Sequence, residues 1–261
     1  MTLLLRETGF TFGGVHSRND MGLIYAEKDG HIAIPEIRRN SYQIAGMSGT
    51  LLLPGEAWQT FTLEGTLYPA EEPRTQAEAQ ALLRDVSAWL TSGRERLIFD
   101  YEPNKYYEAE LSASSKWSLR NWFGGELPVK FTAQPFAWNV TENVSTQEIY
   151  MGYTPISISV ETGLPAPLKV TVENIGSATI SELGIGSEIY FMGLNLSPGQ
   201  TLTIDTALPA DAAIGNVSAL PYATRFSPIT LHNGANSVPV TFFSVPNGGR
   251  ARVTVSTRGR W

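Results

Sequence analysis

In the second half of this 261-residue chain, apolar residues alternate with polar ones in short runs that are separated by turn sequences. This alternation is typical of β-strands with one buried face, and no helical periodicity interrupts it. Turn signals such as Ser197-Pro198-Gly199-Gln200 and His232-Asn233-Gly234-Ala235-Asn236 lie between the runs. The spacing predicts an antiparallel β-sandwich with core positions Ile156, Ile158, Val160, Leu168, Val170, Val172, Ile189, Phe191, Leu194, Leu202, Ile204, Val238, Val240, Phe242, Val253 and Val255.

The first half combines strand patterns with one amphipathic helix. Thr75 can cap a helix, and Ser92-Gly93 is a usual helix end, so the sequence predicts a helix over about residues 75–92. Apolar residues recur within it at three- and four-residue intervals and form one stripe: Ala79, Leu82, Leu83, Val86, Trp89 and Leu90. The flanking residues predict two short strands within 8–34 and longer strands at Glu95–Tyr101, Tyr106–Trp117 and Leu127–Trp138.

Residues 35–68 predict a β-hairpin that continues into a strand. Gly46 and Gly49 flank a tight link, because glycine adopts backbone angles that other residues avoid. Pro54-Gly55 makes a second turn. Apolar residues at 61, 63 and 67 then alternate with polar ones, as in a strand with one buried face.

Composition changes near Trp138 and indicates a domain boundary. Residues 1–140 hold 30 charged side chains and five of the six tryptophans, whereas residues 141–261 hold 14 charged side chains. The polar segment Thr141–Gln147 would connect the two parts. We therefore expect two domains, 1–140 and 141–261, in a protein that is mainly β with one helix.

Composition also argues against several classes of function. A net charge of −6 argues against broad, sequence-independent contact with nucleic acid or an anionic membrane. No cysteine is present, which excludes disulfides, thiolate zinc sites and cysteine nucleophiles. The sequence shows neither a signal-peptide core nor an apolar run long enough to cross a membrane, so we expect the chain to be made in the cytoplasm and to stay there.

The three histidines, His16, His31 and His232, are far apart and form no metal-binding spacing, so we expect no metal site. No Walker-type sequence and no G-x-G-x-x-G occurs, so we expect no cofactor. Ser48 lacks the G-x-S-x-G spacing of a nucleophile elbow.

Glu108 and Glu110 are the remaining catalytic candidates. They lie two apart on one predicted strand, so both carboxylates point to one face, which is the minimum for hydrolysis of a glycosidic bond. The neighbouring basic residues Arg96, Lys105 and Lys116 favour a charge-paired, solvated strand face instead. We therefore expect no catalytic residues and no enzymatic activity.

Five motifs, in order along the chain, resemble the distal tail (Dit) proteins of long, flexible-tailed bacteriophages. Residues Phe10–Ser17, followed by Met21-Gly22-Leu23, are similar to F-x-F-(N/G)-G-x-x-S and a following G-L in that family. The hairpin link often reads P-G-R-(D/N)-G there, and Ala45–Gly49 keeps the glycines without the charged pair. Three C-terminal stretches are similar to L-x-P-G-(E/Q)-x-L-x-I-D, x-x-G-x-N-x-(I/V) and V-x-V-x-x-R-x-R-(Y/W): Ser197–Asp205, Gly234–Val238 and Val253–Trp261.

The resemblance implies a small N-terminal β-barrel with a hairpin and one helix, and a galectin-like C-terminal sandwich. It also implies a structural virion protein: a homohexameric ring at the tail tip, assembled in the host cytoplasm, with a channel through which DNA passes without specific binding. The implied partners are other copies of the chain, the major tail tube protein, a tail-associated or tail-fibre protein, and receptor-binding proteins. No membrane contact is implied.

An alternative function is that of a carbohydrate-binding module. Sugar sites on β-sandwiches use exposed aromatic side chains beside polar groups. The second domain offers Tyr150, Tyr153, Tyr190, Tyr222 and Trp261. A host cell-wall glycan would be the ligand in this interpretation.

Overall fold

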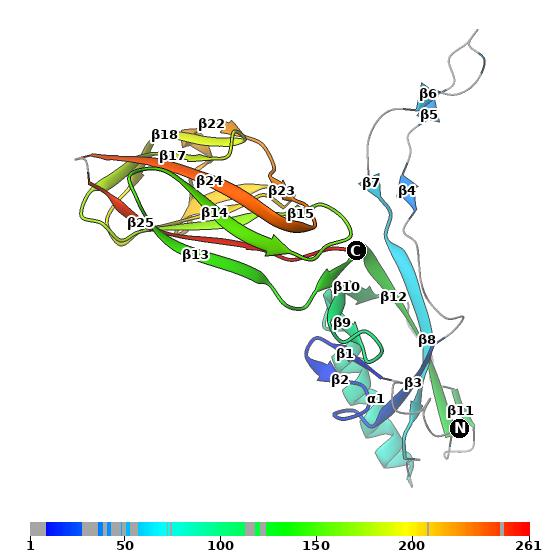
Figure 1. The fold of residues 1–261 in the computed structure, drawn as a ribbon. Helices are drawn as coiled ribbons and strands as arrows, with labels where there is room; N and C mark the ends of the chain where they lie inside the picture. Colours follow the sequence, from blue (N-terminus) through cyan, green and yellow to red (C-terminus); the bar gives the residue numbers. More distant parts are fainter. Residues whose placement is uncertain are drawn as a thin grey trace. The chain divides into compact units, whose positions relative to one another are not determined.

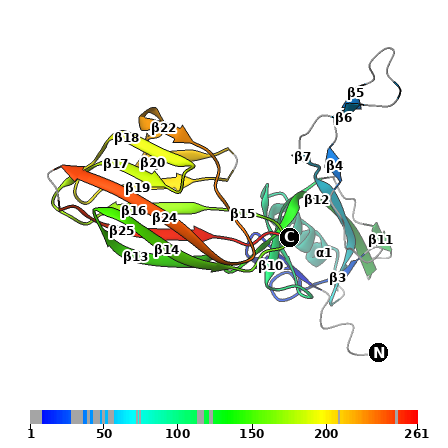
Figure 2. The same cartoon turned by 45° about the horizontal axis from the view of Figure 1, so that its top comes forward.

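The structure is a computed structural model, and it describes residues 9–27, 36–38, 41–42, 48, 51–52, 57–71, 73, 75–112, 118–120, 124–207, 209–245 and 248–261. The protein is mainly β, as predicted, and the described residues contain one α-helix. The chain divides into two compact units, Met1–Val140 and Thr141–Trp261, which are described separately below (Figures 1 and 2).

The first unit is built on an eight-stranded antiparallel sheet. Seven of its strands follow the order β2-β1-β9-β10-β12-β8-β3, and β11 pairs with β12 outside this path. The strands are β1 (Phe10–Phe12), β2 (Val15–His16), β3 (Leu23–Glu27), β8 (Phe61–Pro69), β9 (Glu95–Phe99), β10 (Lys105–Leu111), β11 (Ser118–Arg120) and β12 (Gly124–Asn139). β10 begins one residue before the predicted strand Tyr106–Trp117, whose residues 113–117 lie outside the described part, and β12 is longer than predicted.

Ser17 connects the two ends of this sheet. Its backbone N–H donates to the carbonyl of Phe10 at 2.8 Å, and its carbonyl accepts from the N–H of Leu23 at 2.7 Å. Its hydroxyl accepts from the N–H of Phe10 at 3.1 Å, and the residue is fully buried. In the described residues β2 and β3 do not pair with each other, and the sheet forms a half-barrel, in keeping with the small β-barrel that the resemblance implied.

The helix α1 (Gln76–Leu90) packs its apolar stripe on the concave core of the sheet. Thr75 caps it, since its hydroxyl accepts from the N–H of Glu78 at 3.2 Å, as predicted. The Trp89 ring stacks on Phe10 with centroids 5.5 Å apart, and its indole N–H donates to the Phe12 carbonyl at 2.8 Å. The helix is therefore fixed to β1 by both an aromatic stack and a buried hydrogen bond.

The predicted hairpin is present in the described residues. Its strands β4 (Ile37–Arg38) and β7 (Ala57–Trp58) pair, as do β5 (Ser41–Tyr42) and β6 (Leu51–Leu52). The links at Ala45–Gly49 and Pro54-Gly55 lie largely outside the described residues. At the base of the hairpin, the centres of the Trp58 and Phe136 rings lie 5.9 Å apart, and Phe136 belongs to β12. Strand β7 leads into β8 (Figure 1).

The second unit is an antiparallel sandwich, as predicted. Its first sheet has the order β13 (Asn143–Tyr150), β25 (Arg250–Thr257), β16 (Lys169–Asn174), β19 (Thr201–Asp205), β20 (Asp211–Ile214) and β21 (Val217–Ser218). Its second has the order β14 (Gly152–Val160), β24 (Gly234–Val245), β17 (Thr179–Ile185), β18 (Ile189–Leu196) and β22 (Ala223–Phe226). Two smaller elements complete it: a sheet of β15 (Ala166–Pro167) and β23 (Thr230–Leu231), and the 3-10 helix η1 (Leu220–Tyr222).

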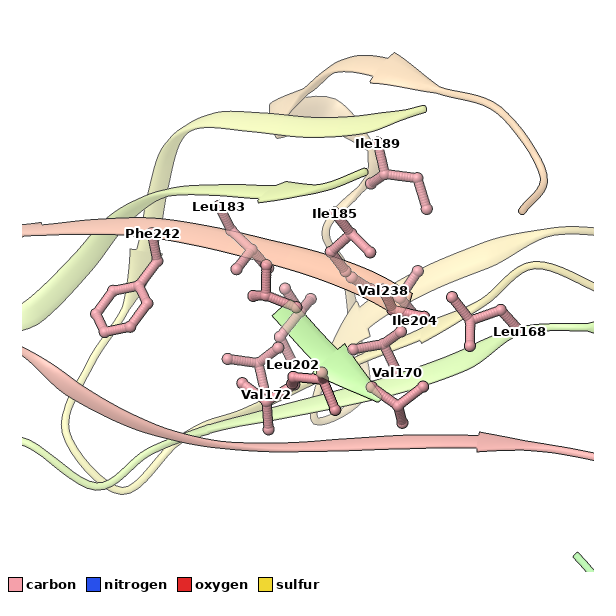
Figure 3. Close-up of a cluster of buried hydrophobic side chains, with 14 of the residues drawn as sticks. Leu168, Val170, Val172, Leu183, Ile185, Ile189, Leu202, Ile204, Val238 and Phe242 are labelled. Atoms are coloured by element: carbon pink, nitrogen blue, oxygen red, sulfur yellow. The ribbon is translucent and has the colours of Figure 1, made fainter. Parts of the chain in front are cut away.

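One hydrophobic core lies between the two sheets. Figure 3 shows residues of β16 and β19 pointing toward residues of β17, β18 and β24. Every core position predicted from the alternation is buried. Because these residues point inward, the residues that alternate with them along each strand form the outer faces of the sandwich.

Ser17→Ala tests the connection between the sheet ends. The substitution leaves the buried N–H of Phe10 without its acceptor, so we expect a loss of about 1–3 kcal/mol in the free energy of unfolding of the first unit. Urea unfolding followed by tryptophan fluorescence measures this, because five of the six tryptophans lie in that unit. Ser92→Ala, at an exposed position, is the matched control. Equal stability of the two variants would contradict the assignment.

Candidate interaction surfaces

Glu108 and Glu110 lie on the outer face of the first sheet. Ala109 is buried and Tyr107 and Leu111 pack against the core, so the two glutamates point the other way, as predicted. Glu108 is paired in register with Arg96 of β9, and a Glu110 carboxylate oxygen lies 3.8 Å from the Arg94 guanidinium.

Two other basic residues near this face also have interaction partners. Lys105 forms an ion pair with Glu102 at 2.9 Å, and the Arg96 guanidinium lies 4.6 Å from the centre of the Tyr106 ring. Lys116 lies outside the described residues. This arrangement is that of a charge-paired strand face.

His16 is held in one tautomer by its hydrogen bonds. Its Nδ1 accepts from the backbone N–H groups of Arg18 at 3.0 Å and Asn19 at 3.1 Å. The proton of a neutral ring therefore lies on Nε2, which donates to Asp100 at 3.0 Å. The side chain thus fixes the loop after β2 against the end of β9.

The other residues considered from the sequence are His232, Ser48 and His31. His232 lies in an exposed turn, where its N–H donates to the Asn236 side chain at 3.1 Å, and Ser48 lies at an exposed bend. His31 lies outside the described residues. Within the described part of the chain, no three His, Asp or Glu side chains gather in a way that could hold a metal ion. In the same described part, neither helix is both long enough and apolar enough to cross a membrane.

Two of the five candidate aromatic residues share a surface on the second unit. The pairing registers place Tyr153, Thr241, Gly184 and Tyr190 in one row across β14, β24, β17 and β18. The row lies on the outer face of the five-stranded sheet, because Leu183 and its neighbours in the registers point into the core. We call this surface the aromatic face.

Phe243 and Met192 belong to the adjacent row of the aromatic face, on either side of Glu182. Their exposed fractions are 46% and 54%, and that of Tyr153 is 68%. Sequence reasoning missed Phe243 and Met192. The signal for Phe243 was available, since Val238, Val240 and Phe242 are core positions and the next residue must point outward.

The remaining aromatic candidates lie elsewhere. Tyr150 ends β13 opposite Arg250, on the other sheet. The Trp261 ring packs against Gly163, where a Cβ atom would lie 2.7 Å from it. Tyr222 ends η1, just before β22. The structure thus brings Tyr153 and Tyr190 together and separates Tyr150 and Trp261 from them.

The first unit offers hairpins rather than a long free strand edge. The two long strands β10 and β12 lie in the middle of the sheet order, each between two other strands. The protruding pairs are β4–β7 with β5–β6, and β11 with the start of β12. Paired hairpins of this kind can reach a neighbouring subunit.

Comparison with known proteins identifies a likeness in fold. No family model and no curated protein sequence matches the chain. Among solved structures, the chain is similar to SPP1 Dit, whose structure is described as a paradigm of the hub of the adsorption apparatus in phages that infect Gram-positive bacteria. The TM-score is 0.65 at 12% identity, over 97% of this chain and 98% of that one. The chain therefore shares its fold with SPP1 Dit over 97% of its length.

Glu110→Gln distinguishes a charge-paired face from a catalytic site. The ion pair with Arg94 is about half exposed, so we expect the free energy of unfolding to change by less than about 0.5 kcal/mol. Arg94→Gln should have an effect of the same size. Hydrolysis of a cell-wall glycan by the unmodified protein, abolished in the Glu110 variant, would instead support the glycosidase hypothesis.

Proposed function

We propose that this protein is the hub of a phage tail tip. In this role it joins the tail tube to the adsorption apparatus as a homohexameric ring, and DNA passes through the central channel without specific binding. The observation that carries the proposal is the likeness in fold to SPP1 Dit over 97% of the chain. The order of the five sequence motifs is independent support, because no alignment of the structures is needed to find it.

The motif residues have structural roles in this chain, which supports reading them as a signature of the fold. Phe10 and Phe12 are fully buried beside Ser17, which connects the sheet ends. Gly199 has a φ of 79°, and the Gln200 side chain closes the same turn by accepting from the Ser197 N–H at 2.8 Å. These roles require particular residues at particular positions, whatever the protein binds.

The C-terminal motif likewise acts within the sandwich. Val253 and Val255 are fully buried in the core. Arg258 forms an ion pair with Glu142 at 3.2 Å, and the N–H of Arg260 donates to the Thr162 hydroxyl at 2.9 Å. The last residues therefore fasten the end of the chain to the sandwich.

The first unit is proposed to form the ring. A closed ring of identical subunits needs two different surfaces that fit each other head to tail. The hairpin of β4–β7 and β5–β6 supplies one protruding surface, and the outer face of the sheet supplies a second. A net charge of −6 per chain suits a channel to which DNA does not adhere.

The second unit, proposed to be a galectin-like sandwich, would face outward and carry peripheral tail parts. In the proposal the ring contacts the major tail tube protein on one side and a tail-associated or tail-fibre protein on the other, and receptor-binding proteins attach at the periphery. The protein would be assembled in the host cytoplasm and then reside in the virion.

A truncation after Val140 tests which unit forms the ring. Each unit has its own hydrophobic core, so each is expected to fold without the other. We expect residues 1–140 to have the same number of subunits as the full chain in sedimentation velocity, and residues 141–261 to be monomeric. A folded but monomeric first unit beside an oligomeric full chain would contradict this assignment.

A further inference from the structure

The ring of Tyr190 is held across the surface of the aromatic face. A Cβ atom on Gly184, in the next strand, would lie 3.2 Å from the ring, so the glycine leaves the space that the ring occupies. The phenol hydroxyl donates to a carboxylate oxygen of Glu182. The ring is thus fixed at both ends, so the Tyr190 side chain loses little conformational entropy when a ligand binds.

A second carboxylate lies in the turn before Tyr190. Glu188 is two residues before Tyr190, in the turn that joins β17 to β18. Its carboxylate lies over Gly186 and accepts from the N–H of Ser187 at 2.8 Å and from the Ser187 hydroxyl at 2.6 Å. These hydrogen bonds lower the pKa of Glu188, so the group stays ionised and keeps its capacity to accept further hydrogen bonds.

A hollow of about 310 Å³ adjoins Glu188. Its polar lining includes Thr230, Ser237 and Asn236, and its apolar lining includes Pro239. The Asn236 side chain shapes the hollow, since it donates to the carbonyls of His232 at 2.8 Å and Gly234 at 3.0 Å. The Thr230 and Ser237 hydroxyls are both on exposed residues. The volume is at the lower end for a small-molecule site.

We propose that this part of the aromatic face binds a neutral pyranose unit of a glycan, with the sugar ring on Tyr190 and its hydroxyls bonded to Glu182, Glu188 and the lining of the hollow. A pyranose has an apolar face of C–H groups and a rim of hydroxyls. That pattern matches a fixed aromatic ring flanked by hydrogen-bond acceptors. Arg225 follows Tyr190 in the same row and acts on Glu188, so the site holds two carboxylates and one guanidinium. The remaining negative charge disfavours an anionic sugar, because like charges repel.

Tyr153 extends the same row and would contact a second sugar unit. It is separated from Tyr190 by Thr241 and Gly184, neither of which is a large side chain. An extended glycan lying across the strands would therefore cover both rings. The inference depends only on the second unit, so it stands or fails independently of the proposed tail-hub role.

The full-length protein, labelled and applied to an array of neutral and acidic bacterial cell-wall glycans, provides the first test. We expect binding to neutral glycans only. Calorimetric titration with a bound glycan should then give a Kd that Tyr190→Ala weakens about tenfold or more, as truncating a central aromatic contact does. Tyr190→Phe keeps the ring and should bind within a few-fold of the unmodified protein, whereas Glu188→Gln should weaken binding.

Tyr150→Ala is the matched control, since Tyr150 is 69% exposed and lies on the other sheet. It should leave the Kd unchanged, and circular dichroism should show all variants folded. The proposal is overturned if no glycan binds at millimolar concentration, if only acidic glycans bind, or if Tyr150→Ala weakens binding as much as Tyr190→Ala. Absence of glycan binding together with protection of Tyr190 in the oligomer would assign this face to a protein partner.

Discussion

The buried hydrogen bonds of Ser17 connect the two ends of the sheet in the first unit, where β2 and β3 do not pair with each other. They link β1, which carries Phe10 and Phe12, to the start of β3. The helix then closes the core, because Trp89 stacks on Phe10 and donates to the Phe12 carbonyl. The base of the hairpin depends on the same sheet through the Trp58 contact with Phe136. A surface that must fit a neighbouring subunit needs such a rigid support.

Local periodicity predicted which residues are buried but not which strands are neighbours. The helix, its Thr75 cap and the sandwich core followed from three- to four-residue and two-residue spacing. The pairing of β1 with β9 joins residues far apart in sequence, and no local pattern encodes it. The register shift in β12 opposite Glu108 was also missed, although Pro135, which has no N–H to donate, lies within that stretch.

The candidate surfaces also depend on strand pairing that local sequence patterns do not predict. Strand parity placed Glu108 and Glu110 on one face. The ion pair of Glu110 with Arg94, and the position of Glu108 opposite Arg96, depend on how β9 pairs with β10. The tyrosines of the second unit were recognised as candidates from the sequence, whereas the row that contains both Tyr153 and Tyr190 requires the order of four strands. Long-range strand pairing determines which side chains share a surface, whereas the motif residues described above mainly stabilise the fold.

The proposed role requires a ring with an open channel, so the mass of the purified full-length protein is the first quantity to measure. Light scattering across a range of concentrations, with negative-stain images of the main peak, gives both the subunit number and the shape. We expect a particle of six times the 28.5 kDa chain mass, with a central opening in projection. A particle of one chain mass at every concentration, with no ring in the images, would contradict it.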